Sequence, residues 1–261
     1  MLRILIIILS LMVIGCGESA RTEIKIVTTV YPLYLEVTNI TRGVDSVEVV
    51  LLNEKAGCLH EYQLTPGDMQ LISDADILVV NGLGLEPFDI KSARRVINAS
   101  EGLNAEEHAW LSITKTIKQV EKICAALSEY DADHAEIYKR NALEYVNDLT
   151  TLRDEAQISL SILKNRQIIA THGFDCLAEE FNLEIVDTIE EITPARRVEL
   201  INELNKMDKK IICADEVTPA IESIAKESSA QIIKLDMITK PGGGYIERML
   251  NNITALLKGL N

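Results

Sequence analysis

The chain has 261 residues, of which 47% are hydrophobic and 25% charged, a composition typical of a folded globular protein rather than a disordered one. Its net charge of −14 argues against nucleic acid and anionic membrane surfaces as electrostatic partners. The same charge favours a cation as ligand, although solubility alone explains it equally well.

The first residues have the features of an export signal. A basic residue is followed by an apolar run (4–14) that is too short to span a bilayer comfortably. Val13-Ile14-Gly15-Cys16 is similar to a lipobox, the cleavage and lipidation site of secreted lipoproteins, with Ile14 in the place of a more usual small residue. We therefore expect a signal peptide over residues 1–15 and a lipid anchor on Cys16. The alternative is a plain signal peptide with a chance cysteine.

Strand and helix patterns alternate after the signal. Thr65-Pro66 starts a helix well, with Thr as N-cap and Pro at the first helical position. The apolar run 77–80 is typical of a strand buried on both faces. Such alternation predicts a parallel sheet. The predicted strands are 23–29, 46–52, 77–80 and 96–97, and the predicted helices are 32–41 and 65–74.

A single long helix is predicted in the middle of the chain. Residues 131–163 contain no Gly and no Pro, and apolar side chains recur there at steps of three or four. A helix of this length would extend about 50 Å, longer than one globular lobe needs. We therefore expect it to connect two lobes rigidly. Its apolar face consists of Tyr138, Ala142, Tyr145, Leu149, Leu152, Ala156, Leu160 and Leu163.

The alternation resumes after this helix. The predicted strands are 167–170, 183–186, 210–213 and 231–235, and the predicted helices are 173–181, 193–207, 219–227 and 245–257. We therefore predict an α/β fold of two lobes, each a parallel β-sheet flanked by helices, joined by one long rigid backbone helix. The predicted division is a signal peptide (1–15), an N-terminal metal-binding lobe (16–130), the connecting helix (131–164) and a C-terminal metal-binding lobe (165–261).

Three of the four histidines lie in loops at the ends of predicted elements. These are His60, His108 and His172, and Asp236 also follows a predicted strand. Ligands of open α/β sheets bind outside the carboxyl ends of the strands. Three imidazoles and one carboxylate make a four-coordinate set suited to Zn²⁺ or another first-row divalent ion, although their scattered spacing alone proves no shared site. His134, in the first turns of the long helix among polar neighbours, is interpreted as a solvated helix residue.

The cysteines beyond the signal have no spacing that announces a disulfide framework. Cys124 and Cys213 stand in apolar surroundings and are expected to be small buried side chains. Cys58 lies two residues before the first candidate histidine, and Cys176 lies four residues after the third. Either cysteine could be an alternative sulfur ligand of the metal, or the two could form a disulfide with each other. The remaining alternative is that both side chains serve only for packing.

Several segments in a fixed order resemble one protein family. Residues 57–66 follow the pattern Gly-x-x-His-x-Tyr-x-x-x-Pro, residues 108–111 read His-x-Trp-Leu, and residues 171–174 read Thr-His-Gly-Phe. In these segments the chain resembles the metal-binding lipoproteins, or substrate-binding proteins, of ABC transporters for zinc and manganese. The other matching segments are Val30-Tyr31-Pro32-Leu33, Ala75-Asp76, 81–86, 138–142, Thr193-Pro194, Asp215-Glu216, Leu235-Asp236, Tyr245 and Asn252. Leu59 departs from the family, which usually has Pro there.

The resemblance implies a function and a ligand set. Its implied metal ligands are His60, His108, His172 and Asp236, and Glu216 is expected to support the site rather than bind the ion. The protein would be a monomeric, exported lipoprotein on the outer face of the cytoplasmic membrane, and not an enzyme. It would carry a divalent metal ion as transported ligand to an ABC transporter permease. A histidine at the third ligand position favours Zn²⁺ over Mn²⁺, because imidazole suits Zn²⁺.

Two other functions remain as alternatives. An exported zinc-dependent hydrolase would use the same histidines, with Asp236 as a base and Glu61 or Glu216 nearby. Four protein ligands would close such a site, however, and the sequence has no His-Glu-x-x-His helix. A surface protein of cell adhesion would use the same fold and leave the sites unchanged.

Overall fold

The computed structural model describes residues 23–52, 59, 62–88, 90 and 92–261. The signal segment with Cys16 lies outside the described residues, and so do Cys58, His60 and Glu61. Among the residues that are described, no helix is both long enough and apolar enough to cross a membrane.

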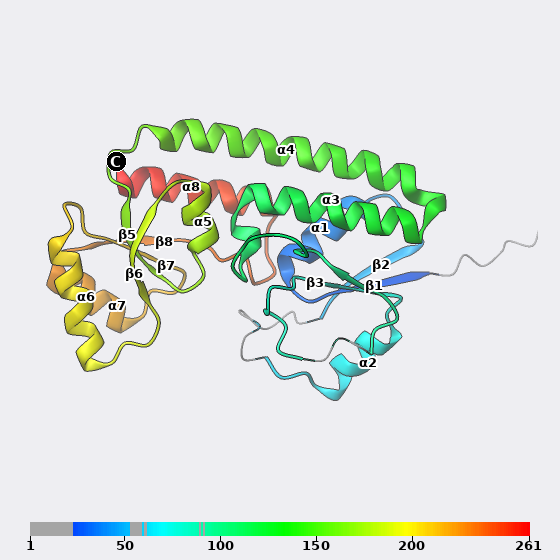
Figure 1. Cartoon of the computed structure of the whole chain (residues 1–261), viewed down its shortest axis with the longest axis horizontal. Helices are drawn as coiled ribbons and strands as arrows, with labels where there is room; N and C mark the ends of the chain where they lie inside the picture. The colour runs from blue at the N-terminus through cyan, green and yellow to red at the C-terminus, as the bar shows by residue number, and fades with distance from the viewer. Residues whose placement is uncertain (1–22, 53–58, 60–61, 89, 91) are drawn as a thin grey trace, which may run out of the picture.

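Two parallel sheets lie at opposite ends of a layer of long helices (Figure 1). The strand order is β2-β1-β3-β4 in the first sheet and β6-β5-β7-β8 in the second, which is the same order relative to the chain. Val27 of the first sheet pairs with Val50 and Leu78, and Ile169 of the second pairs with Asp187 and Ile212. The predicted α/β class with two lobes and one long helix is confirmed.

The predicted strands are all present, with small changes at their ends. The first sheet consists of β1 (Ile24–Thr28), β2 (Val47–Leu51), β3 (Ile77–Val80) and β4 (Val96–Asn98). The second consists of β5 (Gln167–Thr171), β6 (Glu184–Ile189), β7 (Ile211–Ala214) and β8 (Gln231–Lys234). The helices are α1 (Tyr31–Thr41), α2 (Pro66–Asp74), α3 (Ile113–Tyr130), α4 (Ala135–Ser161), α5 (Asp175–Glu180), α6 (Pro194–Lys206), α7 (Pro219–Ser228) and α8 (Tyr245–Leu260), with 3₁₀ turns η1 (Ala109–Leu111) and η2 (Ala132–His134).

Thr-Pro pairs begin three of these helices. In α2 the Thr65 hydroxyl accepts a hydrogen bond from the Asp68 N–H at 3.2 Å, and the Asp68 carboxylate accepts one from the Thr65 N–H at 2.8 Å. This reciprocal capping box satisfies two backbone donors that the helix leaves without partners. Thr193 and Thr218 cap α6 and α7 through their hydroxyls, each again followed by Pro at the first helical position. The helix starts predicted at Thr65-Pro66 and Thr193-Pro194 are therefore confirmed.

The long helix α4 is shorter at both ends than the predicted range 131–163. It begins at Ala135, after the 3₁₀ turn η2, and the apolar face predicted for it is buried. The interpretation of His134 as solvated is wrong. Its side chain is only 13% exposed and its Nδ1 lies 2.7 Å from Asp131 Oδ2, which also accepts a hydrogen bond from the Tyr138 hydroxyl. Asp131 thereby holds the ring at the start of the helix.

Helix α3 was not predicted, although its apolar side chains recur with helical spacing. It begins after Ser112, whose hydroxyl accepts a hydrogen bond from the Lys115 N–H at 3.2 Å. It lies beside α4 and runs antiparallel to it; α4 extends over both sheets, whereas α3 lies over the N-terminal sheet (Figure 1). Its buried apolar residues are Ile113, Ile117, Val120, Ile123, Cys124 and Leu127.

One continuous hydrophobic core joins the lobes. It contains the sheet faces that look toward the helical layer together with the buried faces of α1, α3, α4 and α8. Two smaller clusters lie on the opposite sheet faces, one near α2 and one under α6 and α7. Cys124 and Cys213 are buried free thiols, as predicted. Burial raises the pKa of Cys213 to about 12, so this thiol stays neutral and serves only for packing.

Candidate metal site

Three potential metal ligands converge where the lobes face each other. The ligand atoms of Glu107, His108 and His172 all lie within 4.8 Å of one another. The rings of His108 and His172 meet edge to face, with centroids 5.3 Å apart. His108 comes from the N-terminal lobe just before η1, and His172 follows β5 of the C-terminal lobe. The structure thus brings together two of the histidines predicted as ligands.

Glu107 was missed as a candidate donor. It precedes His108 in the chain, and its carboxylate lies in the same cluster. The only signal in the sequence was this adjacency, since an acidic residue beside a candidate ligand histidine is a second donor of the right kind. His60, the remaining predicted histidine, lies outside the described residues.

The loop with His108 is fixed from the opposite lobe. Trp110 is fully buried, and its indole N–H donates a hydrogen bond of 2.9 Å to the backbone oxygen of Met237. The Tyr245 hydroxyl donates to the Trp110 backbone oxygen at 2.7 Å. The Trp110 ring also stands edge to face against His108, at 5.2 Å between centroids. These contacts hold His108, which is only 2% exposed, in one place.

Gly173 allows the close approach of the two histidines. Its φ of +96° lies in the left-handed region that favours glycine. A Cβ atom at this position would lie 3.0 Å from Nδ1 of His108 and 2.6 Å from Cε of Met237. A side chain here would therefore crowd the His108 ring and displace the methyl group of Met237.

A second set of contacts joins the lobes beside the site. Glu180 of α5 accepts hydrogen bonds from the Ser112 hydroxyl and, at 2.9 Å, from the Thr114 hydroxyl at the start of α3. A carboxylate at a helix N-terminus also interacts favourably with the helix dipole. The lobes are thus tied together on the side of the site that faces the long helices.

Cys176 belongs to this junction rather than to the ligand cluster. It is a buried free thiol, and the Lys115 ammonium lies 3.6 Å from its sulfur. Burial raises the pKa of Cys176, and Lys115 only partly opposes this effect. Its sulfur is not among the atoms that meet at Glu107, His108 and His172. The structure therefore favours packing over metal binding for Cys176, and its pairing with Cys58 falls outside the described residues.

Asp236 lines the same cavity as the histidines but is held by an arginine. The cavity has a volume of about 930 Å³ and is lined by residues that include His108, His172, Asp236 and Arg248. Arg248 donates from Nε to Asp236 Oδ2 and from Nη2 to Asp236 Oδ1, both at 2.6 Å. Asp236 is absent from the tight cluster of potential ligands among the described residues. The structure therefore brings Asp236 to the cavity but not into the cluster.

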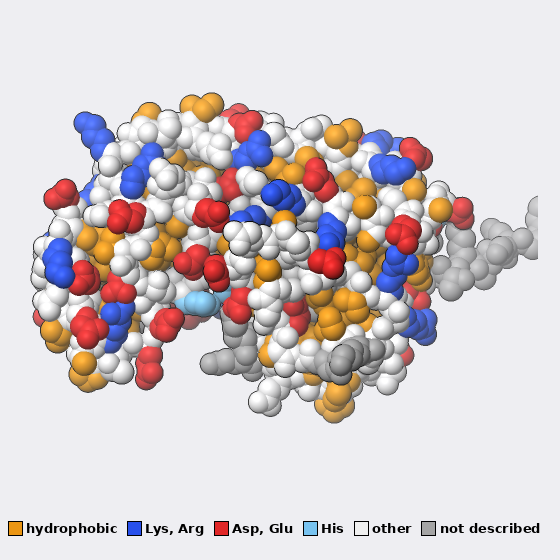
Figure 2. Space-filling model, in the orientation of Figure 1, with side chains coloured by type: hydrophobic (Ala, Val, Ile, Leu, Met, Phe, Trp, Pro, Cys, Tyr) orange, Lys and Arg blue, Asp and Glu red, His pale blue; other side chains and the backbone are white. Residues whose placement is uncertain are grey.

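The charge of Asp236 is stabilised in this arrangement. Burial of the carboxyl group opposes ionisation, but the Arg248 guanidinium and the Ile238 N–H outweigh burial and lower the pKa of Asp236. Glu216 is exposed at the same cavity and forms an ion pair with Lys240 at 3.1 Å. Figure 2 shows histidine atoms at the hollow between the two lobes, with acidic side chains nearby. This donor set of imidazole and carboxylate fits Zn²⁺ and Mn²⁺.

Two parallel-sheet lobes that contribute facing donors to one cavity define the class of two-lobed substrate-binding proteins. A family model described as zinc-uptake complex component A, periplasmic, matches residues 26–259. The chain therefore belongs to this family. Its named relatives are binding proteins of transporters and not enzymes, so the hydrolase alternative has no support among them.

Individual relatives cover nearly the whole chain. The manganese-binding lipoprotein MntA of Halalkalibacterium halodurans is 28% identical, over 98% of this chain and 97% of its own length. The high-affinity zinc uptake system protein ZnuA of Bacillus subtilis is 26% identical, over 94% of this chain and 90% of its own. The solved structure of the binding protein FpvC of Pseudomonas aeruginosa in complex with Ni²⁺ is 28% identical with a TM-score of 0.82, over 91% of this chain and 97% of that one. FpvC has also been solved in complex with Mn²⁺.

Proposed function

We propose that this chain is an exported, lipid-anchored substrate-binding protein that captures a divalent transition metal between its lobes and delivers it to an ABC importer. The observation that carries the proposal is the meeting of His108 and His172, one from each lobe, with the Glu107 carboxylate within 4.8 Å. The relatives support it, because their names include manganese-binding and zinc-uptake proteins. Zn²⁺ is the favoured cargo and Mn²⁺ the next.

The ligand set that we propose is His60, His108, His172 and Asp236, with Glu107 as an additional carboxylate at the same place. Because these ligands come from both lobes, a bound ion ties the lobes together. The shared hydrophobic core limits the accompanying movement to a small one. The permease would then release the ion by drawing ligands of the two lobes apart.

Calorimetry of the metal-free mature protein with Zn²⁺ and Mn²⁺ tests this proposal. We expect one site with higher affinity for Zn²⁺, and we expect His108→Ala/His172→Ala to weaken it by more than about 100-fold, because a tetrahedral site that loses two of its imidazoles is no longer closed. Affinity should fall in acid, since imidazole binds metal only when neutral. His134→Gln is the matched control, because His134 pairs with Asp131 at the start of α4.

Two results would contradict the proposal. One is that the parent protein binds neither ion. The other is that the double variant binds as tightly as the parent, which would place the ion elsewhere. Equal weakening by His134→Gln would show that the loss reflects general damage to the fold and not the removal of ligands.

A further inference from the structure

Helix α8 holds both the backbone and the side chain of Asp236. Arg248 and Asn252 are four residues apart on α8, so both side chains project from one face. The Asn252 side chain accepts a hydrogen bond from the Asp236 N–H at 2.7 Å and donates one to the Asp236 backbone oxygen at 2.8 Å. The Arg248 guanidinium donates hydrogen bonds to the carboxylate itself from two nitrogen atoms. The position of the carboxylate is therefore set by α8.

Arg248 is itself fixed in place. Its Nη1 donates to the Lys240 backbone oxygen at 2.7 Å, and its side chain is only 12% exposed. Its guanidinium lies over the ring of Tyr31 from the N-terminal lobe, 5.7 Å from the centroid. The Tyr31 hydroxyl donates to the Gly243 backbone oxygen at 3.0 Å. Contacts from both lobes thus keep the guanidinium against Asp236.

The hydrogen bonds of Asp236 limit what its carboxylate offers to an ion. A carboxylate has about four lone-pair sites on its two oxygens. Oδ1 accepts from Arg248 and, at 2.8 Å, from the Ile238 N–H, so both of its sites are used. Among the described residues, Oδ2 accepts from Arg248 alone. With Arg248 in place, only Oδ2 has a site left for an ion.

We propose that Arg248 is a specificity-determining residue that restricts Asp236 to coordination through one oxygen. This inference rests on the proposed function, and it concerns which ion the site prefers. Zn²⁺ is satisfied by four ligands in a tetrahedron, so a single oxygen from Asp236 is enough for it. Mn²⁺ prefers more oxygen ligands in octahedral geometry. A bidentate Asp236 would serve Mn²⁺ better but would break the pair with Arg248.

Two substitutions separate geometry from charge. Arg248→Gln removes both the positive charge near the ion and the two-point grip on Asp236. Arg248→Lys keeps the charge but replaces the planar fork by one ammonium group, which does not reproduce a bidentate pair. We expect Arg248→Gln to tighten both ions and to lower the ratio of the Mn²⁺ and Zn²⁺ dissociation constants by about tenfold, because specificity is a difference of affinities. Arg248→Lys should lower the ratio with a smaller gain in overall affinity.

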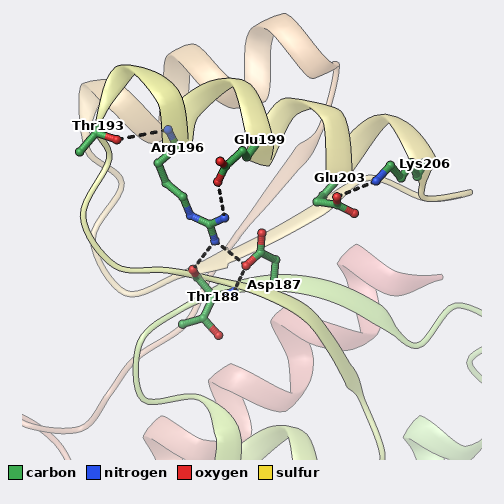
Figure 3. A network of polar contacts seen from close by, with 7 residues as sticks. All are labelled: Asp187, Thr188, Thr193, Arg196, Glu199, Glu203 and Lys206. Atoms are coloured by element: carbon green, nitrogen blue, oxygen red, sulfur yellow. Dashed lines mark hydrogen bonds and ion pairs between the residues drawn. The ribbon is translucent and has the colours of Figure 1, made fainter.

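Arg196→Gln is the matched control. Arg196 of α6 forms an ion pair with Asp187 of β6 in the same lobe, donates to the Thr188 backbone oxygen and pairs with Glu199 (Figure 3). Neither Arg196 nor Asp187 is among the residues that line the cavity. The substitution therefore removes an equal charge and another Arg–Asp pair from the lobe. We expect it to leave the ratio of the two dissociation constants unchanged.

The experiment is competition of Zn²⁺ and Mn²⁺ against a chelator for the mature parent and the three variants, with thermal unfolding of each metal-free protein as a check of folding. If Arg248→Gln does not fold, Arg248→Lys decides. Co²⁺ serves as a second probe, because its visible absorption is strong in tetrahedral and weak in octahedral coordination. We expect weaker absorption per bound ion in Arg248→Gln than in the parent.

The outcomes distinguish this inference from the proposed function. If the parent binds Zn²⁺ and the Arg248 variants show an unchanged or higher Mn²⁺ to Zn²⁺ ratio, the role of Arg248 is wrong and the proposed function stands. If the ratio falls equally in Arg196→Gln, a general charge effect replaces the role of Arg248. If the parent binds neither ion, both proposals fail.

Discussion

The two lobes share one strand order but present their site residues in different ways. On the N-terminal side, His108 is buried and packed against Trp110. On the C-terminal side, His172 is exposed, and the Asp236 side chain is 42% exposed and held by Arg248. One half of the site is therefore fixed by packing, and the other half is held by polar contacts.

The lobes also differ in how their sheets are covered. The face of the N-terminal sheet that looks away from the long helices packs near α2, which has nine residues, whereas the corresponding C-terminal face is covered by α6 and α7. The opposite faces of both sheets merge into one core through the helical layer (Figure 1). This shared layer, rather than either lobe alone, therefore sets the distance between the two halves of the site.

Trp110→Ala has the largest expected effect, and it acts on the half of the site that is fixed by packing. The substitution removes a fully buried indole and its hydrogen bond to Met237 across the lobes. We expect a loss of about 3–5 kcal/mol in the free energy of unfolding, as is typical for Trp→Ala in a core. Metal affinity should fall as well, because His108 loses its packing partner. Denaturant unfolding and calorimetry measure the two effects.

Ile158→Ala serves as the control for this change. Ile158 lies on α4 with 70% of its surface exposed, so its truncation should alter stability by less than about 0.5 kcal/mol. A cost for Trp110→Ala close to that of the control would mean that His108 is not held from the opposite lobe.

Gly173→Ala tests the close approach of the C-terminal half of the site to the N-terminal half. The added Cβ would collide with Met237 and crowd His108 at 3.0 Å. Gly43→Ala is a matched control, because Gly43 has φ +81° and no atom within 4 Å of the added Cβ. Both variants bear the backbone strain, and only Gly173→Ala bears the collision. We expect it to cost about 1–3 kcal/mol more than the control, the usual range for overpacking.

Metal affinity is a second measurement that separates Gly173→Ala from Gly43→Ala. Gly173→Ala should weaken Zn²⁺ binding while Gly43→Ala leaves it unchanged, because only the first substitution crowds the His108 ring. Equal stability losses and equal affinities in the two variants would show that backbone strain alone matters at Gly173.

Much of the fold was accessible from the sequence because its signals are local. The apolar face of α4 repeats every three or four residues, and the pairs Thr65-Pro66 and Thr193-Pro194 mark helix starts. Helix α3, which was not predicted, carries a similar repeat. Strand β6 extends to Ile189, beyond the predicted 186, because its last residues pair with the end of β5. Such pairing depends on the partner strand and leaves no mark in the segment itself.

The site was accessible only in part, for the same reason. His108 and His172 stand out because histidines are few and these lie at the ends of elements. The ion pair of Arg248 with Asp236 depends on the turn that brings α8 back over the end of β8. No local sequence pattern predicts this pairing. The environment of His134 depended on where α4 begins, and boundaries are the least certain part of any assignment from sequence.

Glu36→Gln has the smallest expected effect and concerns the layer that both lobes share. Glu36 lies on α1, which packs against α4, and it is fully buried. Neither of its carboxyl oxygens has a hydrogen-bond partner among the described residues. Burial without such partners raises the pKa of Glu36 well above 4.5. The folded protein therefore keeps this carboxyl protonated over a pH range in which the unfolded chain has lost the proton.

The sign of the pH dependence follows from this difference. Below about pH 4.5 the carboxyl group is protonated in both the folded and the unfolded protein, so its ionisation does not affect the free energy of unfolding. As the pH rises from there toward the folded-state pKa, the parent loses stability, whereas the amide side chain of the variant does not titrate. We therefore expect Glu36→Gln to become more stable relative to the parent as the pH rises from about 4.5 to neutral.

Denaturant unfolding of the metal-free proteins between pH 4 and 8 measures this gain. Glu155→Gln, an exposed position on α4, is the control and should follow the parent at every pH. A stability difference between Glu36→Gln and the parent that stays constant across this range would mean that the carboxyl ionises alike in both states. Water would then reach Glu36 inside the helical layer. Dry packing of this layer would no longer explain the fixed distance between the two halves of the site.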